Sequence, residues 1–262
     1  MAYILNRCLD RFVYPSPTDK TRVTTYDFNG IQCLYRPHES SCKYIVYAHG
    51  NLMTLQSVYE SGIADAIGAS CSANVIVPEY AGYGDLENCN RGVGPDADNL
   101  LYNDVKKVLE YLESRNVTRV YLVGRSLGTG VVMGTLSTYP KMCDMVEGVS
   151  LISPFKSLNS LCPRMIQCIV PSRMPSDRYI KTVASNVRMM LIHGTVDELI
   201  TPDHSEALAA AANANVQVEL IPGMSHAINH RDIQQICTRL AKFTFAQDTE
   251  RHAISPDVFQ SK

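Results

Sequence analysis

Short apolar runs alternate with amphipathic stretches along most of this chain, and that alternation restricts the folds that it can adopt. Six of the runs are too short for helices, and they cover residues 44–48, 75–77, 120–123, 149–152, 189–192 and 216–221. Continuous apolar runs of this length are typical of strands that are buried on both faces of a parallel sheet. Between them, the stretch 96–115 carries apolar residues along one helical face, at Leu101, Val105, Val108 and Leu112.

Helices are also expected at 57–69, 127–139, 202–212 and 230–245. Alternation of this kind predicts an α/β fold with a mostly parallel central sheet, right-handed crossovers and helices on both faces. The chain begins differently, because Asn29-Gly30 separates two runs rich in β-branched and aromatic residues between 21 and 37. Asn-Gly in this setting is a strong hairpin signal, which places an antiparallel N-terminal hairpin ahead of the parallel strands.

Three segments fall outside this pattern. Residues 154–187 are rich in Ser, Pro and Met and long for a simple connection, so we expect either a small cap over the site or no cap. Residues 1–19 form an N-terminal amphipathic segment that would rest on a bilayer surface or pack against the domain; its apolar stripe is Ile4, Leu5, Cys8, Leu9, Phe12 and Val13. Residues 247–262 have the polar composition of a disordered tail, which leaves 20–246 for the domain.

Composition argues against several classes of protein. The formal net charge is −2, and Lys and Arg are scattered, so there is no electrostatic case for nucleic acid as a partner. The nine cysteines form no CxxC pair, which suggests neither a disulfide framework nor a zinc site. No stretch approaches the roughly 20 apolar residues of a membrane span. Polar residues also interrupt the N-terminal region, which therefore lacks the continuous apolar stretch of a signal peptide. We therefore expect a cytoplasmic protein, with weak peripheral membrane contact through residues 1–14.

The strongest chemical signal is Gly124-Arg125-Ser126-Leu127-Gly128, which matches G-x-S-x-G. The pattern directly follows the apolar run 120–123 and opens the helical stretch from 127, which is the strand-turn-helix setting of a serine nucleophile. Flanking glycines suit a turn too sharp for a Cβ. Ser126 would then lie at the carboxyl edge of the sheet, where open α/β folds bind their ligands. The alternative is a glycine-rich turn with an incidental serine.

A serine nucleophile needs a base, and the base needs an orienting carboxylate. Asp197 and His226 lie just past the runs 189–192 and 216–221, so both are expected at the same edge as Ser126. The order serine, acid, histidine is that of the α/β-hydrolases. Other candidates for the acid are Glu198, Glu79 and Asp203; other histidines, expected to be packed, hydrogen-bonded or solvated, are His38, His49, His193, His204, His230 and His252.

An oxyanion formed at Ser126 needs two backbone N–H donors. Leu127 would supply one from a helix N-terminus, and Asn51, in the loop after the run 44–48, is the first choice for the other. Leu52 is the second choice and, with Tyr83, a candidate wall of the substrate pocket; Tyr83 would otherwise be a packed aromatic. No metal and no cofactor are implied, because Gly82-Tyr83-Gly84 belongs to no complete phosphate-loop motif.

Five motifs together resemble the eukaryotic α/β-hydrolase-domain family that contains protein depalmitoylases and is also catalogued among serine peptidases of the prolyl-oligopeptidase clan. They are His49-Gly50-Asn51, Glu79-Tyr80-Ala81-Gly82-Tyr83-Gly84, the Ser126 pentapeptide, His193-Gly194-Thr195-Val196-Asp197 and Ser225-His226. The resemblance implies the α/β-hydrolase fold, triad roles for Ser126, Asp197 and His226, an oxyanion hole at Asn51 and Leu127, and an ester or thioester carbonyl as the target. Departures are Glu79 in place of the usual Asp, Ser225 in place of a glycine, and only Cys8 where depalmitoylases carry a cysteine cluster.

The sequence therefore favours a serine hydrolase that cleaves a carboxylic ester or thioester through an acyl-enzyme on Ser126, with an S-acylated protein as one candidate substrate. An exo- or oligopeptidase of the same fold is the first alternative, although it would need an extra group to bind a peptide terminus. The second is a non-catalytic binding protein on a hydrolase scaffold.

Overall fold

The computed structural model describes residues 22–39, 41–84, 95–165, 167–212 and 216–245. The expected N-terminal segment and polar tail lie outside these residues. Within them, strands and helices follow each other in this order: β1 (Thr25–Phe28), β2 (Ile31–Arg36), β3 (Tyr44–Ala48), α2 (Leu55–Ser61), α3 (Ile63–Cys71), β4 (Asn74–Pro78), α4 (Pro95–Ser114), β5 (Val120–Arg125), α5 (Leu127–Thr138), the 3-10 helix η2 (Pro140–Met145), β6 (Val146–Ile152), the 3-10 helix η3 (Leu158–Leu161), α6 (Ser176–Asn186), β7 (Arg188–Gly194), α7 (Asp203–Ala212), β8 (Val216–Ile221) and α8 (His230–Phe245).

The strands form one eight-stranded sheet in the order β1-β2-β4-β3-β5-β6-β7-β8. β1 pairs antiparallel with β2, and β2 antiparallel with β4, whereas the pairs from β4 through β8 are parallel. The expected hairpin is confirmed, with Asn29 and Gly30 at φ angles of 56° and 83° in its turn. Positive φ at both positions is what a two-residue hairpin turn requires, and Asn-Gly adopts it readily.

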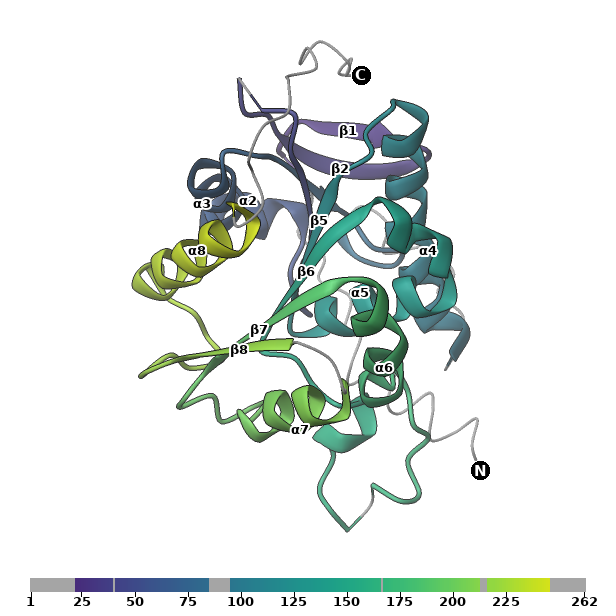
Figure 1. The fold of residues 1–262 in the computed structure, drawn as a ribbon, viewed down its shortest axis with the longest axis vertical. Helices are drawn as coiled ribbons and strands as arrows, with labels where there is room; N and C mark the ends of the chain where they lie inside the picture. The colour runs from purple at the N-terminus through teal and green to yellow at the C-terminus, as the bar shows by residue number, and fades with distance from the viewer. Residues whose placement is uncertain (1–21, 40, 85–94, 166, 213–215, 246–262) are drawn as a thin grey trace.

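Helices cover both faces of the sheet (Figure 1). On one face α4, α5, α6 and α7 pack in sequence, and on the other α2, α3 and α8 pack together. The strands between them send alternate side chains to the two sides. In β5, Leu122 belongs to the core beneath α4 and α5, while Tyr121 and Val123 belong to the core beneath α3 and α8.

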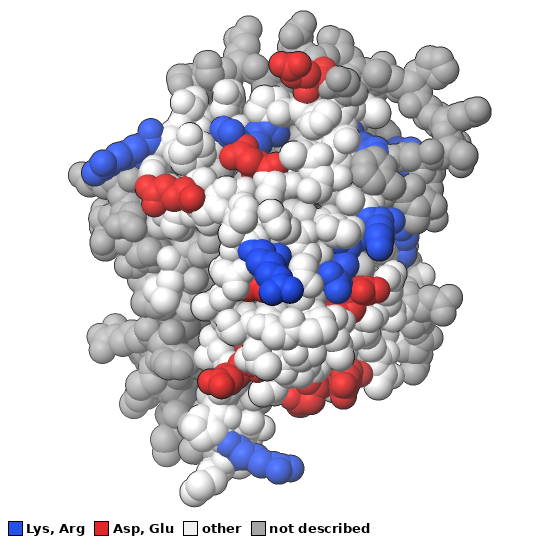
Figure 2. Space-filling model, turned by 90° about the vertical axis from the view of Figure 1, so that its left-hand side faces the viewer, with Lys and Arg blue, Asp and Glu red and all other residues white. Residues whose placement is uncertain are grey.

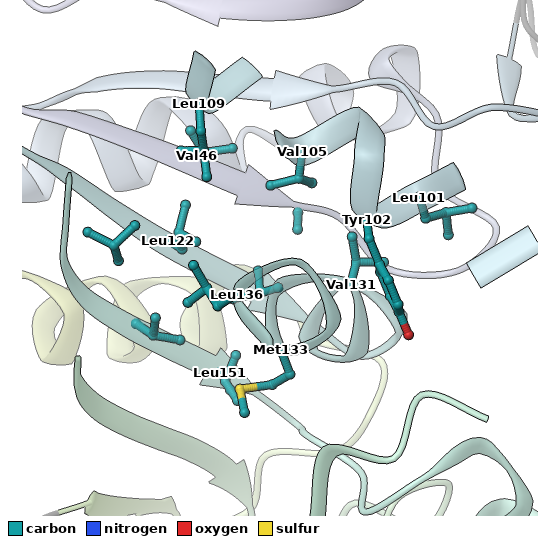
Figure 3. Close-up of a cluster of buried hydrophobic side chains, with 14 of the residues drawn as sticks. Val46, Leu101, Tyr102, Val105, Leu109, Leu122, Val131, Met133, Leu136 and Leu151 are labelled. Atoms are coloured by element: carbon teal, nitrogen blue, oxygen red, sulfur yellow. The ribbon is translucent and has the colours of Figure 1, made fainter. Parts of the chain in front are cut away.

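The core beneath α4 and α5 shows why these helices form where they do. Figure 3 shows side chains from three strands meeting those of the two helices; the labelled residues are Val46, Leu122, Leu151, Leu101, Tyr102, Val105, Leu109, Val131, Met133 and Leu136. Leu101, Val105 and Leu109 repeat every four residues, so they share the face of α4 that is turned to the sheet. Gly134 in α5 lets Tyr102 approach, because a Cβ there would lie 2.1 Å from the Tyr102 ring.

The structure differs from the expected elements in three places. The stretch 57–69 is two helices, α2 and α3, because Gly62 adopts φ 68° and ends the first. Within 154–187, α6 (Ser176–Asn186) packs against α5 and α7 as an ordinary crossover helix, so the part without an α-helix or strand is confined to 154–165 and 167–175. β8 is a half-exposed edge strand and not a strand buried on both faces.

Candidate active site

Ser126 lies at the junction of β5 and α5, at the carboxyl end of a central strand. Its backbone has φ 49° and ψ −117°, which is a glycine-favoured conformation that a side chain adopts only at a cost in strain. The flanking glycines make the turn possible: a Cβ on Gly128 would lie 2.0 Å from the Ala48 carbonyl oxygen, and one on Gly124 would lie 2.6 Å from the Gly128 carbonyl oxygen. Both clashes are with backbone, so no other residue fits without moving the turn.

The structure brings Ser126, His226 and Asp197 together, although they are separated by up to 100 residues. His226 Nε2 lies 3.1 Å from Ser126 Oγ, and His226 Nδ1 lies 2.9 Å from Asp197 Oδ2. Because an ionised carboxylate can only accept, Nδ1 carries the proton and Nε2 presents its lone pair to the serine hydroxyl. This is the tautomer of an imidazole that can take a proton from Ser126.

Asp197 is held in a pocket of hydrogen-bond donors after β7. Its Oδ1 accepts from the backbone N–H groups of Leu199 at 3.1 Å and Ile200 at 2.9 Å. Burial alone would raise the pKa of this carboxyl, but the bonds from His226 and the Ile200 N–H outweigh it, so the pKa lies below its usual value. Asp197 is therefore ionised and fixed in orientation.

Some of the competing acids and histidines have other partners. His193 is fully buried beside Asp197, where its ring nitrogens contact Ser205 Oγ and the Ile200 carbonyl oxygen, each at 2.7 Å. Burial lowers the pKa of His193, which favours its neutral form. Asp203 accepts a hydrogen bond from the Thr201 hydroxyl at the start of α7.

The loop after β3 lies beside the Ser126 turn, as the Gly128 contact with Ala48 requires. Asn51 Oδ1 accepts from the Leu52 N–H at 3.0 Å and from the Tyr83 hydroxyl at 2.8 Å. The Asn51 side chain is thus turned into its own loop, so an oxyanion donor from this residue would be its backbone N–H. Leu127 is the first residue of α5, and the first N–H groups of a helix have no partner within that helix.

Tyr83 is fully buried, so it offers no surface to a ligand. It packs edge-on against Tyr80 and His49, and His49 stacks on Tyr80 with a ring separation of 4.1 Å. Behind this group, Glu79 is buried 3.5 Å from His49 Nε2 and accepts the backbone N–H of Leu55. This buried group of aromatic rings and the Glu79 carboxylate packs against the loop after β3 and stabilises it. Glu79 therefore serves that loop and makes no bond to His226.

Apolar side chains stand exposed on the loops that carry the candidate site. Leu52 is 60% exposed after β3, and Val196 and Leu199 are 51% and 65% exposed on either side of Asp197.

The segment between β6 and α6 is fixed to the domain by Arg173, which is buried and forms a two-point ion pair with Asp98 of α4, at 3.0 and 2.5 Å.

An open cavity of about 420 Å³ lies at the β1–β2 end of the sheet, away from these loops. It is lined by β1, β2 and α2 residues that include Tyr26, Tyr35, Arg36 and Tyr59. Its walls contain no residue of the candidate active site, so the chemistry points to the edge near Ser126 and not to this cavity.

Two site residues were not predicted. Ser153 helps to lower the pKa of Asp197, and Arg125 donates to the His226 carbonyl oxygen at 2.9 Å. Both stand at the carboxyl end of a strand, β6 and β5, and that position is the signal by which they could have been found.

The described part of the chain has neither a metal-binding cluster nor a membrane-spanning helix. Its His, Cys, Asp and Glu side chains form no group that could hold a metal ion. None of its helices combines the length and the hydropathy of a membrane span. On the side of the molecule where α3 and α8 lie, the Lys and Arg among the described residues are interspersed with Asp and Glu and form no large patch of one sign (Figure 2).

Comparison with known proteins places this geometry in context. No family model matches the chain. The uncharacterized protein YfhR of Salmonella typhi is 26% identical over 240 residues, which cover 83% of this chain and 78% of that protein. The α/β hydrolase domain-containing protein 17B of Homo sapiens is 26% identical over 203 residues, covering 76% of this chain and 65% of that one.

Among solved structures, the esterase domain of a Rhodothermus marinus protein superposes with a TM-score of 0.59 at 12% identity, over 84% of this chain and 95% of the domain. A structural likeness at this identity establishes the fold alone. Together with the sheet order and the Ser126 turn, it leads to one conclusion: this chain has the fold of the α/β-hydrolase superfamily, with distant similarity to YfhR and to the 17B protein.

Proposed function

We propose that this protein is a serine hydrolase that cleaves a carboxylic ester or thioester through an acyl-enzyme on Ser126. The observation that carries the proposal is the hydrogen-bonded Ser126–His226–Asp197 triad. His226 Nε2 lies 3.1 Å from Ser126 Oγ, and His226 Nδ1 lies 2.9 Å from Asp197 Oδ2. Distances in this range allow direct proton transfer between the serine and the imidazole. The strained turn at Ser126 adds support, because such strain is concentrated at functional sites.

The reaction would proceed in two halves. Ser126 Oγ attacks the substrate carbonyl carbon while its proton passes to His226 Nε2, and Asp197 stabilises the imidazolium that forms. The backbone N–H groups of Leu127 and Asn51 would bind the oxyanion. Collapse breaks the bond to the alcohol or thiol, which leaves with the proton from His226. Water then attacks the acyl-serine, gives its proton to His226, and the carboxylic acid departs as Ser126 is restored.

The acyl part of the substrate is proposed to be apolar. Leu52, Val196 and Leu199 are exposed on the loops that flank the reacting groups, and apolar surface at a site favours an apolar ligand. The finer proposal, an acyl-protein thioesterase that acts on S-acylated proteins, also rests on the motif resemblance to the depalmitoylase family. A p-nitrophenyl ester series and a matching series of acyl thioesters would measure the preferred chain length and leaving group.

A fluorophosphonate probe tests the nucleophile directly. Wild-type protein should be labelled at Ser126, and Ser126→Ala should not be labelled and should lose ester turnover. Ser114→Ala, at an exposed position at the end of α4, is the matched control and should behave as wild type. Absence of labelling in folded wild-type protein would refute the acyl-enzyme and favour a non-catalytic role.

A further inference from the structure

Arg125, the residue before Ser126, has an unusual set of partners. Its Nη2 donates to the His226 carbonyl oxygen at 2.9 Å, and its Nη1 lies 3.2 Å from Met53 Sδ. Arg125 is partly buried, and no carboxylate of the described residues forms an ion pair with it. Its donors are therefore used on a backbone carbonyl and a sulfur, which points to a geometric role and not to charge neutralisation.

The loop of His226 depends on such a contact. Between Ile221 and the start of α8 the backbone is irregular. Before His226 it is held by bonds from the Met224 N–H to the Ile221 carbonyl at 3.3 Å, from the Val196 N–H to the Met224 carbonyl at 3.2 Å and from the Gly223 N–H to Thr195 Oγ1 at 3.0 Å. After His226 the next anchor is Asn229, whose N–H donates to Asp232 Oδ2 at 2.9 Å, so neither group of bonds acts on the His226 backbone. The bond from Arg125 acts on His226 itself and so fixes the backbone from which the imidazole projects.

The same guanidinium reaches the loop after β3. Met53 Sδ is its second partner, and a Cβ on Gly50 would lie only 3.5 Å from Arg125 Nη1. That loop contains Asn51. One side chain therefore contacts the loop of the proposed base and the loop of the proposed oxyanion donor, while its own backbone leads directly into Ser126.

We propose that Arg125 is a positioning residue, whose guanidinium sets the position of His226 and of the Asn51 loop relative to Ser126. This inference rests on the proposed function for its effect on rate, but the contacts themselves do not depend on it. A displacement of reacting groups by about 1 Å costs on the order of 100-fold in rate. We therefore expect Arg125→Met, which keeps the length but loses the donors, to lower kcat about 100-fold with KM little changed.

Matched variants separate this role from general stability. Arg125→Lys keeps one donor that can reach the His226 carbonyl and should retain more activity than Arg125→Met. In Arg125→Ala, added guanidinium ion at millimolar concentration should restore part of kcat, which a merely structural loss would not allow. Arg188→Met is the control. Arg188 Nε donates to the Glu147 carbonyl at 3.1 Å near the amino ends of β6 and β7, far from the carboxyl ends that carry the site, so kcat should not change.

Hydrogen exchange of residues 222–229 provides a measurement that needs no activity. Exchange in this segment should be faster in Arg125→Met than in wild type, and unchanged in Arg188→Met. If wild type neither labels nor turns over esters, the proposed function fails, while the exchange result still decides the role of Arg125. If Arg125→Met is folded, keeps the wild-type kcat and shows wild-type exchange in 222–229, the positioning role is refuted.

Discussion

The conformation of Ser126 predicts that removing its side chain will stabilise the protein. With φ 49° and ψ −117°, the residue occupies a region that suits glycine. Such a conformation costs a residue with a Cβ about 1–3 kcal/mol. Ser126→Gly should therefore relieve strain while it abolishes the proposed hydrolase activity.

The size of the effect follows from two opposing contributions. Glycine also lowers the free energy of unfolding by about 0.5–1 kcal/mol, because the unfolded chain is more flexible at a glycine and loses more entropy on folding. Relief of about 1–3 kcal/mol less this amount leaves a net gain of roughly 0.5–2 kcal/mol over Ser126→Ala, which keeps the Cβ. Each kcal/mol shifts the melting temperature of a domain of this size by about 2–4 °C. The expected rise is thus roughly 1–8 °C.

The comparison with Ser126→Ala isolates the backbone, since both variants lose the hydroxyl bond to His226. Melting is followed by circular dichroism or differential scanning fluorimetry at one scan rate. Ser114, the last residue of the helix α4, is the reference, and there glycine should melt below alanine. If Ser126→Gly melts at or below Ser126→Ala, the turn is not strained and the reasoning is wrong.

Three further perturbations give clear expectations. Burial raises the pKa of Asp104 to about 6 from 3.8, so the folded state binds a proton more tightly than the unfolded state and loses up to about 3 kcal/mol of stability as pH rises from about 4 to 6. Asp104→Asn keeps an acceptor for the Ala81 N–H but cannot ionise. In urea unfolding, the free energy of unfolding of the variant minus that of wild type should increase from pH 4.5 to pH 8. The same value of this difference at both pH values would contradict the raised pKa. Asp197→Asn should lower kcat roughly 10³–10⁴-fold without loss of fold, because an amide no longer selects the reactive His226 tautomer; near-normal turnover would exclude Asp197 as the orienting acid. Gly128→Ala should destabilise by about 3 kcal/mol or more, since its Cβ meets the Ala48 backbone at 2.0 Å, and a wild-type melting temperature would show that the turn can move.

The sequence predicted the sheet well, because a strand buried between two helix layers must be apolar throughout. β3, β5 and β7 each carry such a run. The hairpin was predicted for a different reason, namely that Asn29-Gly30 has few alternatives to a tight turn. Once the strands were placed, the carboxyl-edge rule was enough to bring Ser126, Asp197 and His226 to one place.

What the sequence did not predict depends on tertiary contacts. In α6 only Ser176, Ile180 and Val183 are buried, so its apolar pattern is too sparse to stand out among serines and methionines. The division between α2 and α3 depends on the left-handed φ of Gly62, whereas an isolated glycine within a helix is often tolerated. The partners of Arg125 come from two loops distant in sequence, and no local pattern indicates them.

The position of β8 at the edge of the sheet has a consequence for how the protein would fail on heating. Ser126 and Asp197, the proposed nucleophile and acid, follow β5 and β7, each of which has a neighbouring strand on both sides. His226, the proposed base, follows a half-exposed strand that is paired on one side only. Fraying begins where a strand has fewest neighbours. The base would then separate from Ser126 while the central strands stay paired, so inactivation would precede the loss of secondary structure and report on the opening of this one edge.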